Sequence, residues 1–173
     1  VLKASDGQWT IDNILKLETD IRSTYVANGS NTVFYLAQSV DVGDISVYVD
    51  DVLKTIDTNY TIRKESRKLV FNTAPAANSV IKAVYSNFDV TLLSNRKVTG
   101  LTSGASAVIE RATKRIITDR LNLGLPFELF IDKKSLSGLF TNGEQVVTDI
   151  IDSNGTIITL NADTFSILTT ILV

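Results

Sequence analysis

The sequence predicts an all-β protein made of two small antiparallel units, each β-sandwich or barrel-like, with a short N-terminal segment in front of them. Three observations lead to this fold class. Short runs rich in Val, Ile, Tyr and Phe recur about every 8–12 residues through the first half of the chain. Gly, Asp, Asn and Pro, which suit the backbone angles of tight turns, separate these runs. The same alternation of apolar runs and Asn-Gly turns returns after residue 127.

Residues 1–23 form a connecting segment whose secondary structure the sequence leaves open. Ile14, Leu17, Ile21 and Tyr25 have the spacing of one face of an amphipathic helix that begins near Asp12. The alternation of residues 14–19 fits a strand about equally well. We slightly favour the helix.

Residues 24–88 form the first β-module. Strands are expected at residues 32–36, 45–49, 52–56, 60–63, 68–72 and 79–85. The turns between them are expected at Asn28-Gly29, residues 42–44, Asp50-Asp51, residues 57–59 and residues 74–76. The basic cluster at residues 63–68 lies between two strands and is interrupted by Glu65. We therefore interpret it as a solvated hairpin end that discourages edge pairing, rather than as a phosphate or glycan patch.

Four segments of this module, in their order, carry a resemblance to a known family. They read NGSNTVFYL (28–36), VYVDDVL (47–53), NYTI (59–62) and LVFNTAP (69–75). They resemble the small immunoglobulin-like β-module found in tail fibres and baseplate-associated proteins of tailed bacteriophages. Asp51 and Asn78 stand where that module usually has Gly. Because Asp and Asn tolerate the left-handed backbone region best among non-glycine residues, the turns are expected to form.

Residues 89–173 form the second β-unit. The segments GLTSGASAV (100–108), FELFI (127–131) and LSGLFTNGEQV (136–146) resemble a second structural pattern of phage proteins. A reversal is expected at residues 141–144, and a hairpin is expected to join residues 146–151 to residues 156–160. Phe140 is expected to fill the core beneath its loop.

One stretch of the second unit gives conflicting signals. Helical spacing is shown by Ala105, Val108, Ile109, Ala112, Ile116 and Ile117. The Ser and Thr content and the resemblance favour strands instead. We predict a pair of strands that bends near Ala112-Thr113.

Composition excludes several classes of function. The chain of 173 residues has a net charge of −2, which argues against a general nucleic-acid or membrane-surface binder. It has no Cys and no His, so thiolate metal sites, disulfides and His-based catalysis are impossible. It also lacks Met, and a chain beginning at Val1 is expected to be an excised or cleaved piece. No apolar run reaches the length of a membrane helix.

The carboxylates offer no recognisable site. Asp50-Asp51 and the pair Asp149 and Asp152 fit turns and strand ends. Asp41, Asp44 and Asp50 lack the spacing of a known calcium loop. Residues 103–106 do not form the G-x-S-x-G elbow of hydrolases. We therefore predict no enzymatic activity, no cofactor and no metal site.

The C-terminal end is the strongest indication of assembly. Residues 165–173 are uncharged and β-prone, and such a strand left open would invite association. The candidate assembly strand contains Phe165, Ile167, Leu168, Ile171, Leu172 and Val173.

The resemblance implies a structural protein of a phage virion, in the tail baseplate or a tail fibre. Its expected partners are other tail proteins and further copies of itself, with no nucleic acid and no membrane. One alternative is a receptor- or glycan-binding module at a fibre tip or on a bacterial surface protein, with Trp9, Tyr25, Tyr35, Tyr48 and Tyr60 as candidate contacts. Another is an immunoglobulin-like module of a bacterial surface protein.

Overall fold

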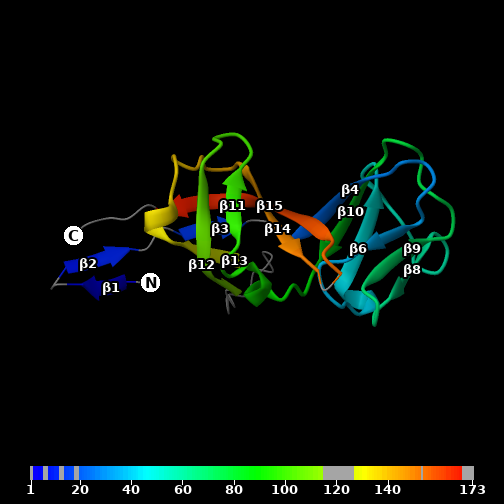
Figure 1. Cartoon of the computed structure of the whole chain (residues 1–173), viewed down its shortest axis with the longest axis horizontal. Helices are drawn as coiled ribbons and strands as arrows, with labels where there is room; N and C mark the ends of the chain where they lie inside the picture. The colour runs from blue at the N-terminus through cyan, green and yellow to red at the C-terminus, as the bar shows by residue number, and fades with distance from the viewer. Residues whose placement is uncertain are drawn as a thin grey trace, which may run out of the picture. The chain divides into compact units, whose positions relative to one another are not determined.

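The computed structural model describes residues 2–5, 8–11, 14–17, 20–114, 127–152 and 154–168. Within these residues the chain is all-β, which confirms the predicted fold class (Figure 1). Helical structure in the described part is limited to three short 3-10 turns: η1 (Val42–Asp44), η2 (Val90–Leu93) and η3 (Lys133–Ser135).

The chain forms two compact units that are not continuous in sequence. Unit 1 contains residues Val1–Asp20, Val90–Asp149 and Ala162–Val173, and unit 2 contains Ile21–Asp89 and Ile150–Asn161. The domain boundaries expected at residues 23/24 and 88/89 stay a prediction, and each unit is described by itself below.

Unit 2 contains two layers of strands. In one sheet the order is β4 (Arg22–Val26), β10 (Val80–Tyr85), β6 (Ile45–Val49) and β7 (Val52–Leu53), and the first half of β15 (Ile157–Leu168) pairs with β4. The second sheet has the order β5 (Val33–Tyr35), β9 (Lys68–Phe71) and β8 (Tyr60–Arg63). All of these pairings are antiparallel.

The core of unit 2 lies between these two sheets. Strand β10 alternates between half-buried and buried residues, so Ile81, Ala83 and Tyr85 point inward. Across the core, the ring of Tyr25 in β4 lies 5.4 Å from that of Phe34 in β5. Period-two burial of this kind is what an antiparallel sandwich requires, because successive side chains point to opposite faces.

Most turns of unit 2 form where the sequence predicted them, but the turn expected at residues 74–76 lies at residues 77–78. Asp50 and Asp51, between β6 and β7, both have positive φ, at 50° and 63°. Asn78, before β10, has φ 69°. The non-glycine residues at these positions therefore do adopt the left-handed region. The strand predicted at residues 52–56 is shorter than expected, because β7 ends at Leu53 and Ile56 forms a single bridge.

Unit 1 is a sheet with the order β14 (Gln145–Ile151), β11 (Lys97–Gly100), β12 (Ser106–Lys114), β13 (Phe127–Ile131), β3 (Ile14–Leu17) and the second half of β15. An additional pairing joins β14 to β15. Strands β1 (Leu2–Ser5) and β2 (Gln8–Ile11) form a separate antiparallel hairpin. The predicted hairpin from β14 to β15 is present, and its turn includes Gly155 with φ 79°.

The slightly favoured helix near the N-terminus is wrong. Residues 14–17 are strand β3, which lies between β13 and β15. Ile14, Leu15 and Leu17 are all buried, since a central strand is covered on both faces. The remaining residues of the helical pattern, Ile21 and Tyr25, belong to unit 2. The apparent helical spacing therefore joined residues of separate elements, and strand pairing prevailed over it.

The preference for strand over helix in this stretch is confirmed, but the described residues form one continuous strand, β12, up to Lys114 and not a pair of strands. The irregularity of β12 lies between Ile109 and Arg111 rather than near Ala112-Thr113, because the register with β13 shifts there. Ile116 and Ile117 lie outside the described residues. Phe140 is half-buried, so the expectation that it fills the core is also wrong.

The candidate assembly strand lies partly within the sheet. The backbone of Phe165, Ile167 and Leu168 belongs to β15, where Ile167 pairs with Leu15 and Leu168 with Ile14. Ile171, Leu172 and Val173 lie outside the described residues. Its role in assembly stays a prediction.

Candidate functional site

The carboxylate of Glu144 is a buried charged group of unit 1. Glu144 directly precedes β14 and follows the turn in which Gly143 has φ 79°. Only 4% of the residue is exposed. A buried charge must be compensated by hydrogen bonds or by an opposite charge, so its partners decide what it does.

Two loops donate hydrogen bonds to this carboxylate. From the loop after β11, the backbone N–H groups of Thr102 and Ser103 bind Oε2 at 3.0 and 2.9 Å, and the hydroxyl of Ser103 binds Oε1 at 2.8 Å. From its own loop, the N–H of Thr141 binds Oε1 at 2.7 Å. We call this arrangement the Glu144 cradle. It fastens residues 101–103 to residues 141–144.

The backbone of Glu144 is also engaged. Its carbonyl accepts hydrogen bonds from the N–H of Thr164 at 3.0 Å and from the Thr164 hydroxyl at 2.8 Å. Thr164 is 1% exposed and belongs to β15. Glu144 therefore links two loops and one strand of unit 1.

The cradle requires a glycine at position 100. A Cβ built on Gly100 would lie 2.4 Å from Oε2 of Glu144 and 2.5 Å from its Cδ. Such distances are far below van der Waals contact, so any side chain here would displace the carboxylate. The segments GLTSGAS and NGE thus depend on one another through the close approach of Gly100 to the Glu144 carboxylate as well as through the hydrogen bonds.

The chemistry of the cradle suits anchoring better than catalysis. Burial raises the pKa of Glu144, but the hydrogen bonds from Ser103, Thr141 and Thr102 lower it more, and the pKa lies below the ordinary value of 4.5. A carboxylate with a lowered pKa is a weak general base. The Ser103 hydroxyl is accordingly held as a donor and is not activated as a nucleophile.

A second buried carboxylate, Asp152, shapes the turn between β14 and β15. Its Oδ1 accepts hydrogen bonds from the N–H groups of Asn154 and Thr156, both at 2.8 Å. Burial raises the pKa of Asp152, whereas these N–H groups and the nearby Arg67 guanidinium, 3.8 Å from Oδ2, lower it more. This carboxylate also serves a turn.

The other carboxylates considered for a metal site are each engaged separately. Asp41 pairs with Lys64 and Asp51 with Lys82, both at 2.6 Å, and Asp50 accepts the Val80 N–H at 2.8 Å. Across the described residues, no three acidic side chains gather as a metal site would require. Nor does any helix in the described part have the length and apolarity to cross a membrane.

The basic cluster lies in a turn, and the described tyrosines named as candidate contacts are packed or hydrogen-bonded within unit 2. Residues 64–67 form the turn between β8 and β9, as predicted, and Arg67 has φ 50°. The hydroxyl of Tyr25 donates to the Tyr35 carbonyl at 2.5 Å, and Tyr60 is only 4% exposed. Tyr35 lies beneath the Lys68 ammonium, and Tyr48 is half-buried. The side chain of Trp9 lies outside the described set. The described tyrosines therefore do not form an exposed aromatic platform.

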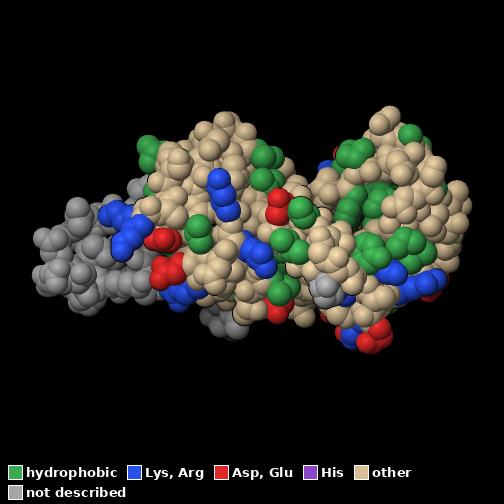
Figure 2. All heavy atoms as spheres, viewed as in Figure 1, with side chains coloured by type: hydrophobic (Ala, Val, Ile, Leu, Met, Phe, Trp, Pro, Cys, Tyr) green, Lys and Arg blue, Asp and Glu red, His purple; other side chains and the backbone are tan. Residues whose placement is uncertain are grey.

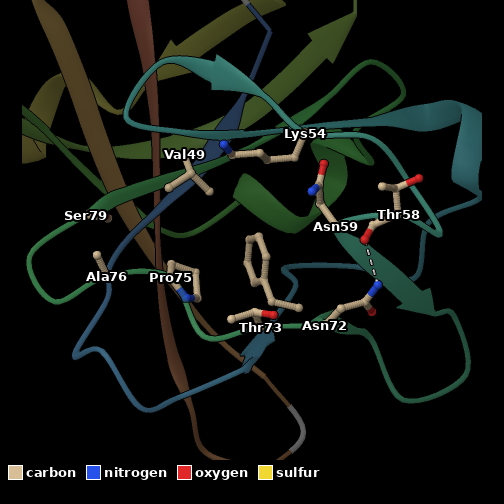
Figure 3. A pocket seen from close by; sticks show the side chains of 10 residues that line it. Val49, Lys54, Thr58, Asn59, Asn72, Thr73, Pro75, Ala76 and Ser79 are labelled. Atoms are coloured by element: carbon tan, nitrogen blue, oxygen red, sulfur yellow. Dashed lines mark hydrogen bonds between the residues drawn. The ribbon is translucent and has the colours of Figure 1, made fainter.

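Unit 2 also has a surface pocket of about 320 Å³ (Figure 3). Its lining is polar except for four apolar side chains; it consists of Val49, Lys54, Thr58, Asn59, Phe71, Asn72, Thr73, Pro75, Ala76 and Ser79. In Figure 3 Lys54 and Asn59 lie on one side, with Asn72, Thr73 and Pro75 opposite them.

Nothing in the sequence singles out the pocket residues. Asn59, Asn72 and Thr73 stand at strand ends and turns, where polar residues are ordinary. The pairing of β8 with β9 brings Asn59 and Asn72 together, and the pairing of β6 with β7 brings Val49 close to the residues before Lys54. Glu144 and Gly100 were part of a recognised pattern, but no role for them followed from it.

Comparisons with known proteins gave no relatives: no family model matches the chain, and no curated protein or solved structure is similar to it.

Proposed function

We propose that this chain is a structural component of a phage tail, in the baseplate or a fibre, and that it acts through protein–protein contacts. Its partners are other tail proteins and further copies of the chain. The observation that carries the proposal is the use made of the residues that resemble tail modules: in both units they hold turns and loops in place.

In unit 2 these residues fix hairpin geometry. The side chain of Asn28 accepts hydrogen bonds from the N–H groups of Ser30 and Asn31 at 2.9 and 2.7 Å. Asp50 and Asp51 provide the two-residue turn between β6 and β7. Positive φ at both central residues matches the right-handed twist of the flanking strands. These motif residues therefore determine the geometry of the turns.

In unit 1 one exposed leucine, Leu101, lies in a loop of the Glu144 cradle, and a second, Leu139, lies two residues before Thr141. Leu101 is 57% exposed and Leu139 is 76% exposed. Exposed apolar side chains on loops that are fixed by buried hydrogen bonds lose little entropy on binding, which favours their use as contacts. Elsewhere the surface is mixed: on the face in Figure 2, basic, acidic and hydrophobic side chains are interspersed. A mixed surface supports specific assembly contacts rather than a single electrostatic partner.

The proposal is tested on tailed particles from a culture that carries the gene. Particles are purified by density gradient, and their peptides are identified by mass spectrometry. Peptides of this chain are expected in constant ratio to the major tail protein across the gradient fractions. Peptides found only in the soluble lysate, at the top of the gradient, would refute a place in the virion.

A further inference from the structure

From the pocket in unit 2 we infer a binding site for an acidic sugar, meaning a hydroxylated ring that carries a carboxylate. This goes beyond the proposed assembly function. The pocket volume of about 320 Å³ lies at the lower end of small-molecule sites. A single monosaccharide residue suits that size.

The charge of the lining selects an anion. Lys54 is the one ionisable residue among those that line the pocket, and no acidic side chain lines it. Lys54 is half-buried, and its ammonium makes no hydrogen bond or ion pair with another described residue. Asp50 attracts Lys54 electrostatically, but the pKa of Asp50 is lowered first by the Val80 N–H and the Ser79 side chain and only lastly by Lys54. The ammonium is therefore available to a ligand carboxylate.

The polar groups of the lining suit hydroxyls. The side-chain oxygen of Asn59 accepts a hydrogen bond from the Thr55 N–H at 2.9 Å. Its amide nitrogen therefore remains as the donor for a ligand. Asn72 uses its nitrogen to donate to the Thr58 carbonyl at 2.8 Å, so its oxygen is left as an acceptor. A donor and an acceptor on opposite sides are the complement of ring hydroxyls, each of which both donates and accepts.

The remaining walls are apolar and suit the C–H face of a sugar ring. Val49, Phe71, Pro75 and Ala76 contribute them. Pro75 has a fixed φ and Phe71 is packed into the core at 5% exposure, so these walls are rigid. Pre-formed walls reduce the entropy cost of binding a small ligand.

The test is an NMR titration of the full chain with glucuronate, glucose and acetate. The reporters are the backbone amides of residues 54, 59 and 72 and the side-chain NH₂ groups of Asn59 and Asn72. We expect glucuronate to shift these signals in a saturable way, at least about tenfold more tightly than either glucose or acetate. No saturable shift with glucuronate, or equal binding of acetate or glucose, would overturn the inference.

Two variants and a control locate the site. Asn59→Asp keeps the oxygen that accepts the Thr55 N–H but places a negative charge in the pocket, so it is expected to weaken glucuronate binding at least about tenfold. Lys54→Gln is expected to do the same. Lys97→Gln removes an equal charge from an exposed position in unit 1 and should leave binding unchanged. Unaltered binding in both pocket variants, with the folded NMR spectrum retained, would place the ligand elsewhere and refute the assignment.

Discussion

At the scale of the residue, the hydrogen bonds to Glu144 have the largest consequence. The carboxylate accepts hydrogen bonds from three backbone N–H groups and one hydroxyl in a buried position. Replacing it by an amide keeps the volume but turns one oxygen into a donor that faces other donors. This loss of hydrogen bonding is expected to destabilise the two loops that the Glu144 cradle joins.

Glu144→Gln is therefore expected to lower the free energy of unfolding by about 1–3 kcal/mol, the cost of leaving a buried hydrogen-bond donor without an acceptor. Urea denaturation followed by circular dichroism measures this difference. Glu65→Gln, at an exposed position in the β8–β9 turn, is the control and should change stability by less than about 0.5 kcal/mol. Equal effects of the two substitutions would show that the cradle contributes nothing specific.

The same carboxylate gives stability a dependence on pH. Its pKa is lowered in the folded state, so its contribution is present above the unfolded pKa of about 4.5 and is lost as pH falls through the folded pKa. The difference in unfolding free energy between the native chain and Glu144→Gln should thus be constant near pH 7 and shrink below about pH 5. Urea denaturation at a series of pH values measures it. A difference that grows on acidification would contradict the lowered pKa.

Gly100 is the second residue on which the cradle depends. Gly100→Ala places a Cβ 2.4 Å from the Glu144 carboxylate and is expected to destabilise the protein by about 1–3 kcal/mol. Gly43→Ala is the matched control, because nothing lies within 4 Å of its added Cβ. Thermal unfolding of the two variants compares them. An unchanged midpoint for Gly100→Ala would mean that the loops shift freely, contrary to the geometry.

At the scale of the element, the turns of unit 2 follow from backbone preferences. Asn78 has φ 69° and an exposed side chain, so conformation rather than contact decides which residues fit there. Asn78→Ala is expected to cost about 1 kcal/mol, since alanine disfavours the left-handed region, whereas Asn78→Gly should be tolerated. Urea denaturation of both variants separates the effects. Equal stability of the Ala and Gly variants would argue against a conformational cause.

Strand β15 gives a prediction that separates folding from assembly. A chain ending at Asp163 loses the residues that pair with β3, from Thr164 to Leu168, and is expected to lose the fold of unit 1. A chain ending at Leu168 keeps every described pair and should retain that fold. Circular dichroism and light scattering on both chains measure fold and association. Loss of self-association in the chain ending at Leu168 would support assembly through Ile171, Leu172 and Val173, while unchanged association would exclude it.

How much of these elements the sequence predicts depends on what determines them. The strands at residues 45–49 and 60–63 and the Asp50-Asp51 turn follow from local preference, and their predicted bounds agree with β6 and β8. Strand β3 does not, because its burial on both faces comes from β13 and β15, which are distant in sequence. The Glu144 cradle and the pocket were missed for the same reason. Their members converge only through pairing between strands.

At the scale of the whole molecule, the proposed function requires contacts that folding itself does not use. Leu101 and Leu139 are exposed, so replacing both by Ser should leave the free energy of unfolding within about 0.5 kcal/mol of the native value. The double variant is expected to be incorporated less into tailed particles, which quantitative mass spectrometry of gradient-purified particles measures. Normal incorporation would show that these leucines are not assembly contacts.

The way the buried carboxylates are used supports the proposed structural role. The described carboxylates that are buried, Glu144 and Asp152, bind backbone N–H groups of loops and turns. Groups used in this way are unavailable for acid–base chemistry, and rigid loops are what a permanent assembly requires.

The most direct measurement is a cryo-electron-microscopy reconstruction of the tail of particles that encode the chain. The account predicts density for both β-units, repeated with the symmetry of the baseplate or fibre and in contact with neighbouring subunits. A well-resolved tail in which neither unit can be placed would contradict it.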